Sequence, residues 1–215
     1  MLRAMPYDLT PHLDPAHCAL VVFECMEGVV GPESNLPGLA AAVREDKVLD
    51  HIASLLATAR STGGRVFYCE GEKRADGVGN PFNTPLEMRL RAAAGGESAT
   101  TPPMGRTVSE VAPQEGDVVI AREHGLTGFY ESGLDAYLRN TGTRTVVLVG
   151  VSVNIGILGT AIEAVNRGYT VVVPTDCVAS DPPDYKELAL RYSVRNVAFL
   201  STSEEVASAW RALGR

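Results

Sequence analysis

The stretch TVVLVGVSVNIGILGTAIEAVNRGYTVVVPTDCVA, residues 145–179, decides the fold of this chain. Its first apolar run, residues 145–149, predicts a buried strand that ends in a turn of small residues at Gly150. A helix is expected next, and then a second apolar strand over residues 169–173. A strand–helix–strand unit of this kind makes its strands parallel, with the helix on one face of the sheet. Ligands of such sheets bind outside the carboxyl ends of the strands, where the turn at residues 150–156 lies.

The rest of the chain extends this pattern in both directions. Four more apolar runs predict strands, at residues 18–24, 65–69, 117–121 and 196–201. Helices are expected over residues 39–62, in a short patch at 86–94, over 132–139, and from an N-cap at Ser203. Six strands alternating with helices predict a single α/β domain over residues 1–215, built as a three-layer, doubly wound, mostly parallel sheet. Residues 1–16 are expected to be an irregular arm and residues 28–38 a loop.

Composition excludes several classes of function. The formal net charge is −7 and no basic run occurs, so neither nucleic acid nor an anionic membrane surface is an expected partner. No apolar run approaches the length of about 18 residues that a membrane span needs, and the first residues lack an apolar signal core, so a cytoplasmic location is expected. The four histidines share no metal-ligand spacing, and no dinucleotide or P-loop motif appears, so no metal or cofactor is expected. The four cysteines lack CxxC spacing and are predicted to be small buried thiols.

A family pattern accompanies the deciding stretch. Gly150-Val151 follows the buried strand, and Thr160-Ala161, Ala164 and Gly168-Tyr169 follow in the helix and at its end. This arrangement resembles that of the isochorismatase-like hydrolases, also called the cysteine hydrolase superfamily. The resemblance covers residues 17–207 and implies strand order 3-2-1-4-5-6, with a non-proline cis peptide between Val151 and Ser152. It also implies a site where an Asp after strand one, a Lys after strand three and a nucleophilic Cys, six residues after the Gly, meet at the strand ends.

Glu24 stands where the resemblance expects the Asp. A carboxylate that ends an apolar run is partly desolvated, which raises its pKa and suits a general acid or base near neutral pH. Glu24 is therefore the first candidate for a catalytic group. The alternative is a carboxylate that caps a loop or pairs with a nearby Arg.

The position of the family Lys is ambiguous. It is Arg122 when counted from the end of the third strand, and Glu123 when counted back from Phe129. Arg122 is a candidate catalytic residue that would orient Glu24 or bind an anionic group through its bidentate guanidinium, but it is no proton shuttle. The alternative is a solvated surface pair between Arg122 and Glu123.

The position six residues after Gly150 is Gly156, so the resemblance is to an atypical member that lacks the nucleophilic Cys. A subset of the family, the isochorismatases proper, also carries Gly here and hydrolyses a vinyl ether without a covalent intermediate. Asn154-Ile155-Gly156 resembles that subset. Alternatively, Gly156 only allows a ligand close to the backbone, or fills space at the start of the helix.

Several loop residues are expected to line the pocket and bind substrate. His124 would supply the missing base; the alternative is a loop histidine without a role. Cys25 is expected to point away from the site if Glu24 points into it, because successive side chains of a strand alternate. The predicted substrate-binding residues are His124, Phe129, Val151, Ser152, Asn154 and Gly156.

Two functions from different classes remain open. The first is a cofactor-free hydrolase acting on a small polar metabolite, with Glu24 as general acid/base and no covalent intermediate. The second is a catalytically inactive relative that binds a small molecule or a protein partner through the retained pocket.

The irregular residues 70–106 mix apolar and turn residues, which indicates a cover over the site or a partner contact. A homodimer or homotetramer is therefore expected.

Overall fold

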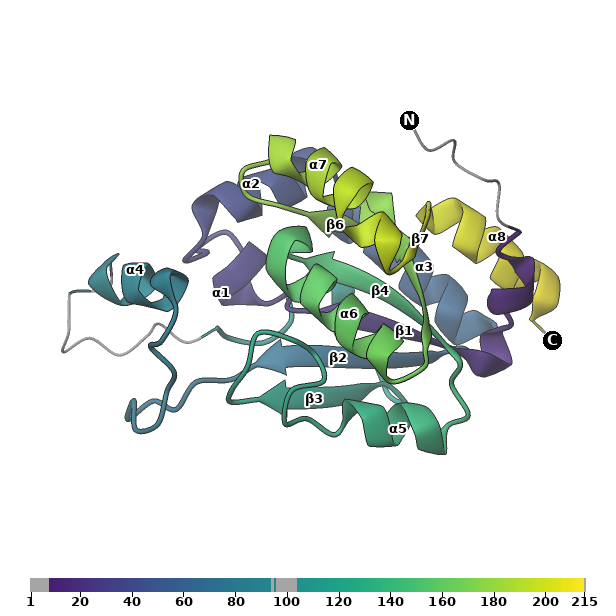
Figure 1. The fold of residues 1–215 in the computed structure, drawn as a ribbon, viewed down its shortest axis with the longest axis horizontal. Helices are drawn as coiled ribbons and strands as arrows, with labels where there is room; N and C mark the ends of the chain where they lie inside the picture. The colour runs from purple at the N-terminus through teal and green to yellow at the C-terminus, as the bar shows by residue number, and fades with distance from the viewer. Residues whose placement is uncertain (1–7, 94, 96–103, 215) are drawn as a thin grey trace.

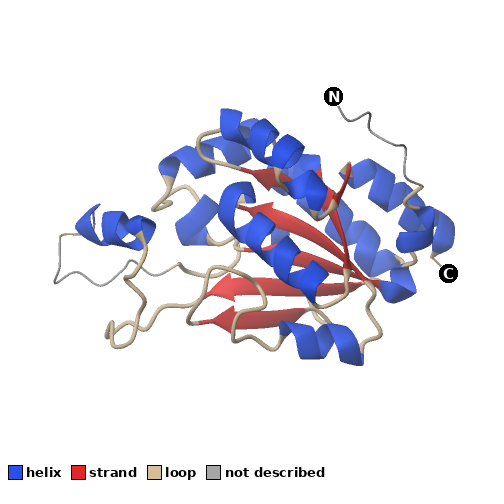
Figure 2. Cartoon of the chain, in the orientation of Figure 1, coloured by secondary structure: helices blue, strands red, loops and turns tan. Residues whose placement is uncertain are grey.

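The protein is described by a computed structural model that covers residues 8–93, 95 and 104–214 (Figure 1). Parts of two predicted segments, residues 1–7 of the arm and residues 94 and 96–103 of the irregular connection, lie outside the described residues. The chain alternates strands with helices around one central sheet (Figure 2). The predicted α/β architecture with a mostly parallel sheet is confirmed.

The sheet has seven strands, of which six follow the order β3-β2-β1-β4-β5-β7. Its strands are β1 Cys18–Phe23, β2 Arg65–Gly71, β3 Val118–Arg122, β4 Thr145–Val151, β5 Thr170–Pro174, β6 Val178–Ala179 and β7 Phe199–Ser201. Every pairing between these strands is parallel. The expected order 3-2-1-4-5-6 is therefore correct, with β7 as the sixth strand.

The predicted count of six strands is wrong by one. The additional strand, β6, has only two residues and pairs with the end of β4 through Gly150 and Val151. Two residues are too few to give a period-two pattern, so the sequence offered no signal for it. The last strand is also shorter than the expected 196–201, because residues 194–196 form a 3-10 turn.

Helices cover both faces of the sheet (Figures 1 and 2). They are α1 Glu27–Val30, α2 Pro37–Glu45, α3 Val48–Ser61, α4 Pro85–Ala93, α5 Leu134–Asn140, α6 Leu158–Asn166, α7 Asp184–Tyr192 and α8 Ser203–Leu213. A five-residue π-helical turn, Val153–Ile157, precedes α6. Short 3-10 turns occur at Thr10–His12, Pro15–His17, Ser109–Val111, Thr175–Cys177 and Val194–Asn196.

Alternating side chains of the central strands form two cores. Leu20 and Val22 of β1 pack with α3 and with Trp210 of α8 on one face. Ala19, Val21 and Phe23 pack with α5, α6 and α7 on the other face. All six residues of β1 are buried, as expected for a central strand covered on both sides.

Three predicted helix boundaries need correction. The helix expected over residues 39–62 is two helices. Lys47 adopts a left-handed conformation with φ 52°, which ends the helical path and separates α2 from α3. The predicted loop at 28–38 begins inside the short helix α1. The N-cap of α8 is Thr202 rather than Ser203: Thr202 and Glu205 form a capping box, and Ser203 donates to Asp176 instead, with Oγ–Oδ2 at 2.6 Å.

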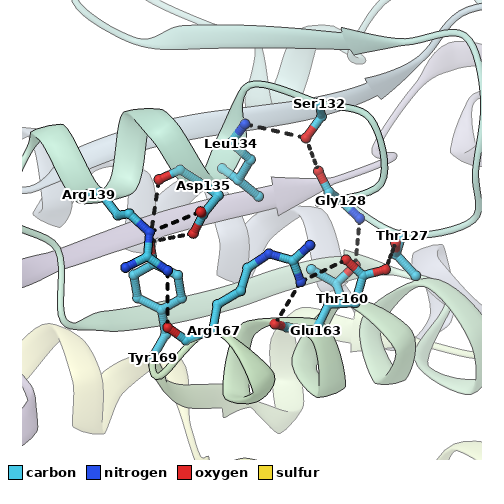
Figure 3. A network of polar contacts seen from close by, with 10 residues as sticks. All are labelled: Thr127, Gly128, Ser132, Leu134, Asp135, Arg139, Thr160, Glu163, Arg167 and Tyr169. Atoms are coloured by element: carbon cyan, nitrogen blue, oxygen red, sulfur yellow. Dashed lines mark hydrogen bonds and ion pairs between the residues drawn. The ribbon is translucent and has the colours of Figure 1, made fainter.

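A polar network ties the loop after β3 to the helices that cover it (Figure 3). Thr127 donates its hydroxyl proton to Glu163 of α6 at 2.6 Å, and the Gly128 N–H donates to Thr160 at 2.9 Å. Ser132 donates back to the Gly128 carbonyl at 2.6 Å. These bonds hold the loop after β3 against α6.

Candidate active site

A small cavity lies at the carboxyl ends of β1, β2 and β3 and beside the turn after β4. In Figure 1 the arrowheads of β2, β3 and β4 point toward the end of the molecule where α4 stands, whereas α8 lies at the opposite end. The cavity has a volume of about 100 Å³. Its polar wall consists of Glu24, Glu72, Lys73, Glu87, Arg122, Glu123 and Ser152. Its apolar wall includes Leu36, Leu39, Leu86, Leu90, Met104, Leu126 and Ile155.

Glu24 follows directly after β1 and turns into this cavity. Its backbone has φ 51°, in the left-handed region that a non-glycine residue rarely adopts, and its N–H donates to the Cys69 carbonyl at 3.1 Å. Its side chain is 21% exposed, and all of its neighbours along β1 are buried. A backbone held in an unfavourable region at a cavity wall is typical of functional positions.

Arg122 ends β3 and holds the Glu24 carboxylate. Its Nη2 donates to Oε1 of Glu24, and its Nη1 donates to the Gly125 carbonyl at 3.1 Å. The guanidinium carbon lies 5.0 Å from the centre of the Phe23 ring, and the side chain is only 2% exposed. Arg122 is therefore a buried partner of Glu24, not a member of a solvated surface pair with Glu123.

The environment of Glu24 favours its protonated form. Burial raises the pKa of the Glu24 carboxyl above its ordinary value, and the positive charges of Arg122 and Lys73 offset part of that rise. Oε1 is occupied by Arg122, whereas no donor among the described residues reaches Oε2. One carboxyl oxygen is thus available to a ligand in the cavity.

The turn after β4 carries the features expected of it. The Val151–Ser152 peptide is cis, as predicted. Gly150 has φ 112°, and a Cβ built there would lie 2.1 Å from the Phe23 carbonyl oxygen, so only glycine fits. At Gly156, a Cβ would lie 2.3 Å from Cε1 of Phe23. The Phe23 ring fills the space that a side chain at position 156 would need.

The structure brings some of the predicted site residues together and places others elsewhere. Glu24, Arg122, Ser152 and Gly156 line the cavity. Phe129 lies in the core, stacked on Tyr169, and Val151 is buried in the core on the α3 side. His124 is exposed and contacts the Gly79 carbonyl at 3.1 Å through Nε2. Asn154 accepts a long hydrogen bond from Ser180 at 3.4 Å.

Three charged residues of the cavity, Glu72, Lys73 and Glu87, were not predicted. Lys73, two residues beyond β2, pairs with Glu87 of α4 at 3.0 Å between Nζ and Oε1. Both side chains are nearly buried, at 9% and 12% exposed. The position of Lys73 just after a buried strand was a usable signal, but the irregular sequence around Glu87 gave none.

The four cysteines do not offer an activated thiol. All are buried, and Cys25, next to Glu24, packs into the core on the α3 side. Burial raises the pKa of the Cys18, Cys25 and Cys69 thiols to about 12, so they stay protonated at neutral pH. The predicted small buried thiols are confirmed.

Other parts of the described structure offer less. A larger hollow of about 760 Å³ is lined by Asp8, Pro15, Thr62 and Leu213, which places it at the amino ends of the strands, away from Glu24. Within residues 8–93, 95 and 104–214, no group of three or more His, Cys, Asp or Glu side chains is arranged to hold a metal ion. In the same residues, no helix combines the length and apolar character needed to cross a bilayer.

Fold and site together define a doubly wound parallel α/β protein with a carboxylate–guanidinium pair at the carboxyl edge of its sheet. Comparison with known proteins gives the family: the model of the isochorismatase domain matches residues 18–205, and the chain belongs to the isochorismatase family.

Three relatives illustrate the similarity. The isochorismatase family protein YwoC of Bacillus subtilis is 32% identical over 113 residues, which are 53% of this chain and 59% of YwoC. Maleamate amidohydrolase of Pseudomonas putida is 30% identical over 173 residues, which are 76% of this chain and 74% of that protein. The crystal structure of a cysteine hydrolase from Pseudomonas syringae pv. phaseolicola 1448A has a TM-score of 0.81 at 20% identity, covers 99% of this chain and 100% of its own, and shows a shared fold. The chain spans little more than half of the first curated relatives: 59% of YwoC and 55% of YaaI, also of B. subtilis.

Proposed function

We propose that this protein is a cofactor-free hydrolase of a small polar metabolite, and that Glu24 is its general acid/base. The observation that carries the proposal is the Glu24 carboxyl itself, which is held by Arg122 through one oxygen and open to the cavity through the other. Its raised pKa suits a group that gives and takes a proton near neutral pH. Arg122 acts as a positioning residue, because a guanidinium stays protonated throughout.

The reaction needs one acid/base group and one water molecule. With a vinyl ether, protonated Glu24 gives its proton to the vinyl carbon, water adds to the neighbouring carbon, and the Glu24 carboxylate takes a proton from that water, which leaves a hemiketal. Glu24 then gives this proton to the ether oxygen as the C–O bond breaks and the alcohol leaves, and it takes the hydroxyl proton as the carbonyl group forms. With an amide, the carboxylate first takes the proton of the attacking water and then gives it to the leaving nitrogen. In both cases Glu24 returns to its starting protonation state, and one water molecule has hydrolysed the C–O or C–N bond.

The surroundings of Gly156 support a mechanism without a covalent intermediate. A nucleophilic side chain at this position would need the volume that the Phe23 ring occupies. The buried, protonated thiols offer no substitute, since the thiolate is the reactive form of cysteine. We infer that the chain is an atypical member of its family that works without the nucleophilic Cys.

The relatives support a small polar substrate. Maleamate amidohydrolase and ureidoacrylate amidohydrolase, each 30% identical to this chain over part of its length, are named for hydrolysing small amides. Vinyl ethers, amides and carbamoyl compounds are therefore the substrates to screen. The second candidate, a relative that only binds its ligand, becomes one outcome of that screen.

The test compares wild type with Glu24→Gln, using Glu45→Gln on the exposed end of α2 as a matched control. Removing a general acid/base is expected to lower turnover by about 100-fold or more, and the control should match wild type. Ligand binding without turnover by wild type would favour the binding-only protein. Equal turnover by wild type and Glu24→Gln would reject the role of Glu24.

A further inference from the structure

The cavity contains a second ion pair, between Lys73 and Glu87, in addition to the pair between Glu24 and Arg122. Each pair leaves one buried atom without a hydrogen-bond partner among the described residues, Nε of Arg122 in the first pair and Oε2 of Glu87 in the second. Oε1 of Glu87 accepts from Lys73, whereas Oε2 is buried and has no hydrogen-bond partner among the described residues. A buried carboxylate oxygen without a partner is unfavourable, so this placement of Glu87 is only partly stabilised.

Lys73 and Glu87 differ in how firmly the surrounding structure holds them. Lys73 follows β2 closely, and the backbone next to it is fixed because the Glu72 N–H donates to the Arg122 carbonyl at 2.7 Å. Glu87 belongs to α4, none of whose residues is buried. Figure 1 shows α4 standing apart from the layers of the fold, beyond the carboxyl ends of the strands. Lys73 is therefore a fixed part of the cavity wall, and Glu87 is the partner that can leave.

The other charged side chains of the cavity either have partners already or are exposed to solvent. The Arg122 guanidinium is engaged by Glu24, by the Gly125 carbonyl and by the Phe23 ring. Glu72 and Glu123 are exposed to solvent. Among the described residues of this wall, Lys73 is thus the cation whose anionic partner can be exchanged without dismantling the sheet edge.

Glu87 limits the room for a ligand on one side of the cavity. The cavity has a volume of about 100 Å³, and the groups that border it on the side of α4 are Leu86, Glu87 and Leu90. A ligand that displaces Glu87 leaves Lys73 without its negative charge unless the ligand carries one.

We propose that Lys73 binds a carboxylate group of the substrate, and that Glu87 occupies this place when no substrate is bound. The inference rests on the proposed function for the reacting end of the substrate, which would lie toward Glu24. It defines the substrate class as small monocarboxylates that carry the bond to be hydrolysed. A dianion is disfavoured, because Glu72 and Glu123 add negative charge to the same wall.

The experiment measures binding of two matched ligands, crotonate and its neutral analogue crotonamide, by calorimetry or ligand-observed NMR. Wild type is expected to bind crotonate about tenfold more tightly, since a charge-assisted contact replaces a neutral one. Lys73→Gln should remove this preference. Glu87→Gln should strengthen crotonate binding several-fold, because it removes the competing carboxylate. Arg74→Gln is the control: Arg74 neighbours Lys73 in the chain but pairs with Asp76 at the surface, and its loss should change nothing.

Three results would overturn the inference: no preference for crotonate in wild type, an undiminished preference in Lys73→Gln, or weaker crotonate binding in Glu87→Gln. If wild type binds neither crotonate nor crotonamide, the inference is overturned in the same way. Because the readout is binding, it is independent of turnover. A preference that depends on Lys73 in a protein that hydrolyses nothing would keep this inference and reject the proposed function. Turnover of neutral amides that depends on Glu24, without any preference for a carboxylate ligand, would keep the proposed function and reject this inference.

Discussion

Adding one methyl group at position 156, through Gly156→Ala, is expected to destabilise the protein. The new Cβ would lie 2.3 Å from Cε1, 2.9 Å from Cδ1 and 3.1 Å from Cζ of Phe23. Carbon atoms pack favourably at about 3.5–4.0 Å, so the methyl group overlaps the ring by more than about 1 Å. The ring cannot simply move aside, because Phe23 is fully buried in the core beneath α6.

The expected magnitude follows from two opposing effects. Overpacking a core costs about 1–3 kcal/mol, and the short contact places this site at the upper end. Alanine gains about 1 kcal/mol over glycine within a helix, and Gly156 lies in the helical turn before α6. The net loss in the free energy of unfolding is therefore about 2 kcal/mol. With a urea m value of about 2 kcal/mol/M, the midpoint should fall by about 1 M.

The assay is urea unfolding of wild type and four variants. Gly133→Ala is the matched control, because a Cβ there meets its nearest atom, in Tyr137, at 3.4 Å, and its effect should stay below about 1 kcal/mol. Phe23→Leu replaces the ring that causes the overlap with a smaller side chain. In the double variant, the two changes should be less damaging together than the sum of their separate effects, by about 1 kcal/mol or more.

The reasoning would be refuted by a Gly156→Ala protein as stable as Gly133→Ala, or by single-variant losses that simply add in the double variant. Either result would mean that the Phe23 ring does not fill the space beside position 156. Position 156 could then accommodate a side-chain nucleophile.

Three further predictions concern the thiols, the pH dependence and the assembly. Iodoacetamide at neutral pH should leave turnover unchanged, because burial raises the pKa of Cys25 and Cys69 to about 12; stoichiometric inactivation would point to a thiol nucleophile instead. The folded state favours protonated Glu24, so the stabilisation is present below the ordinary glutamate pKa of about 4.3 and is lost as pH rises through the raised value. Urea titrations should show wild type losing stability relative to Glu24→Gln over that range, and the opposite slope would contradict the raised pKa. Light scattering should detect a homodimer or homotetramer, because apolar Val78 and Met88 are 68% and 58% exposed; a 22.8 kDa species alone at micromolar concentration would reject assembly.

Elements with a strong local pattern were predictable from the sequence. The unit at residues 145–179 has two apolar runs around a helix, and the structure contains β4, α6 and β5 there. The break at Lys47 was not predictable in the same way. Apolar residues with helical spacing occur on both sides of it, and one residue in the left-handed region leaves no mark on that spacing.

The same distinction applies to the site. The sequence predicted Glu24 and Arg122 at one edge of the sheet because each stands at the end of an apolar run, and parallel strands bring such ends together. The pairing of Lys73 with Glu87 joins residues 14 apart across an irregular segment, where no periodicity reveals which side chains meet. Choosing between Arg122 and Glu123 also required the structure, since the end of β3 moved by one residue from its expected place.

The strand order has a consequence for how the chain is made. Among the strands of this sheet β1 is synthesised first, yet it lies at the centre, between β2 and β4. Domains emerge from the ribosome with the N-terminus first, and an unpaired strand edge invites association with other chains. A nascent chain that ends before Thr145 therefore carries β1 with an open edge along all six of its residues. The region that holds Glu24 acquires its second neighbour only when β4 emerges, so truncated products that stop earlier should aggregate rather than persist as smaller folded proteins.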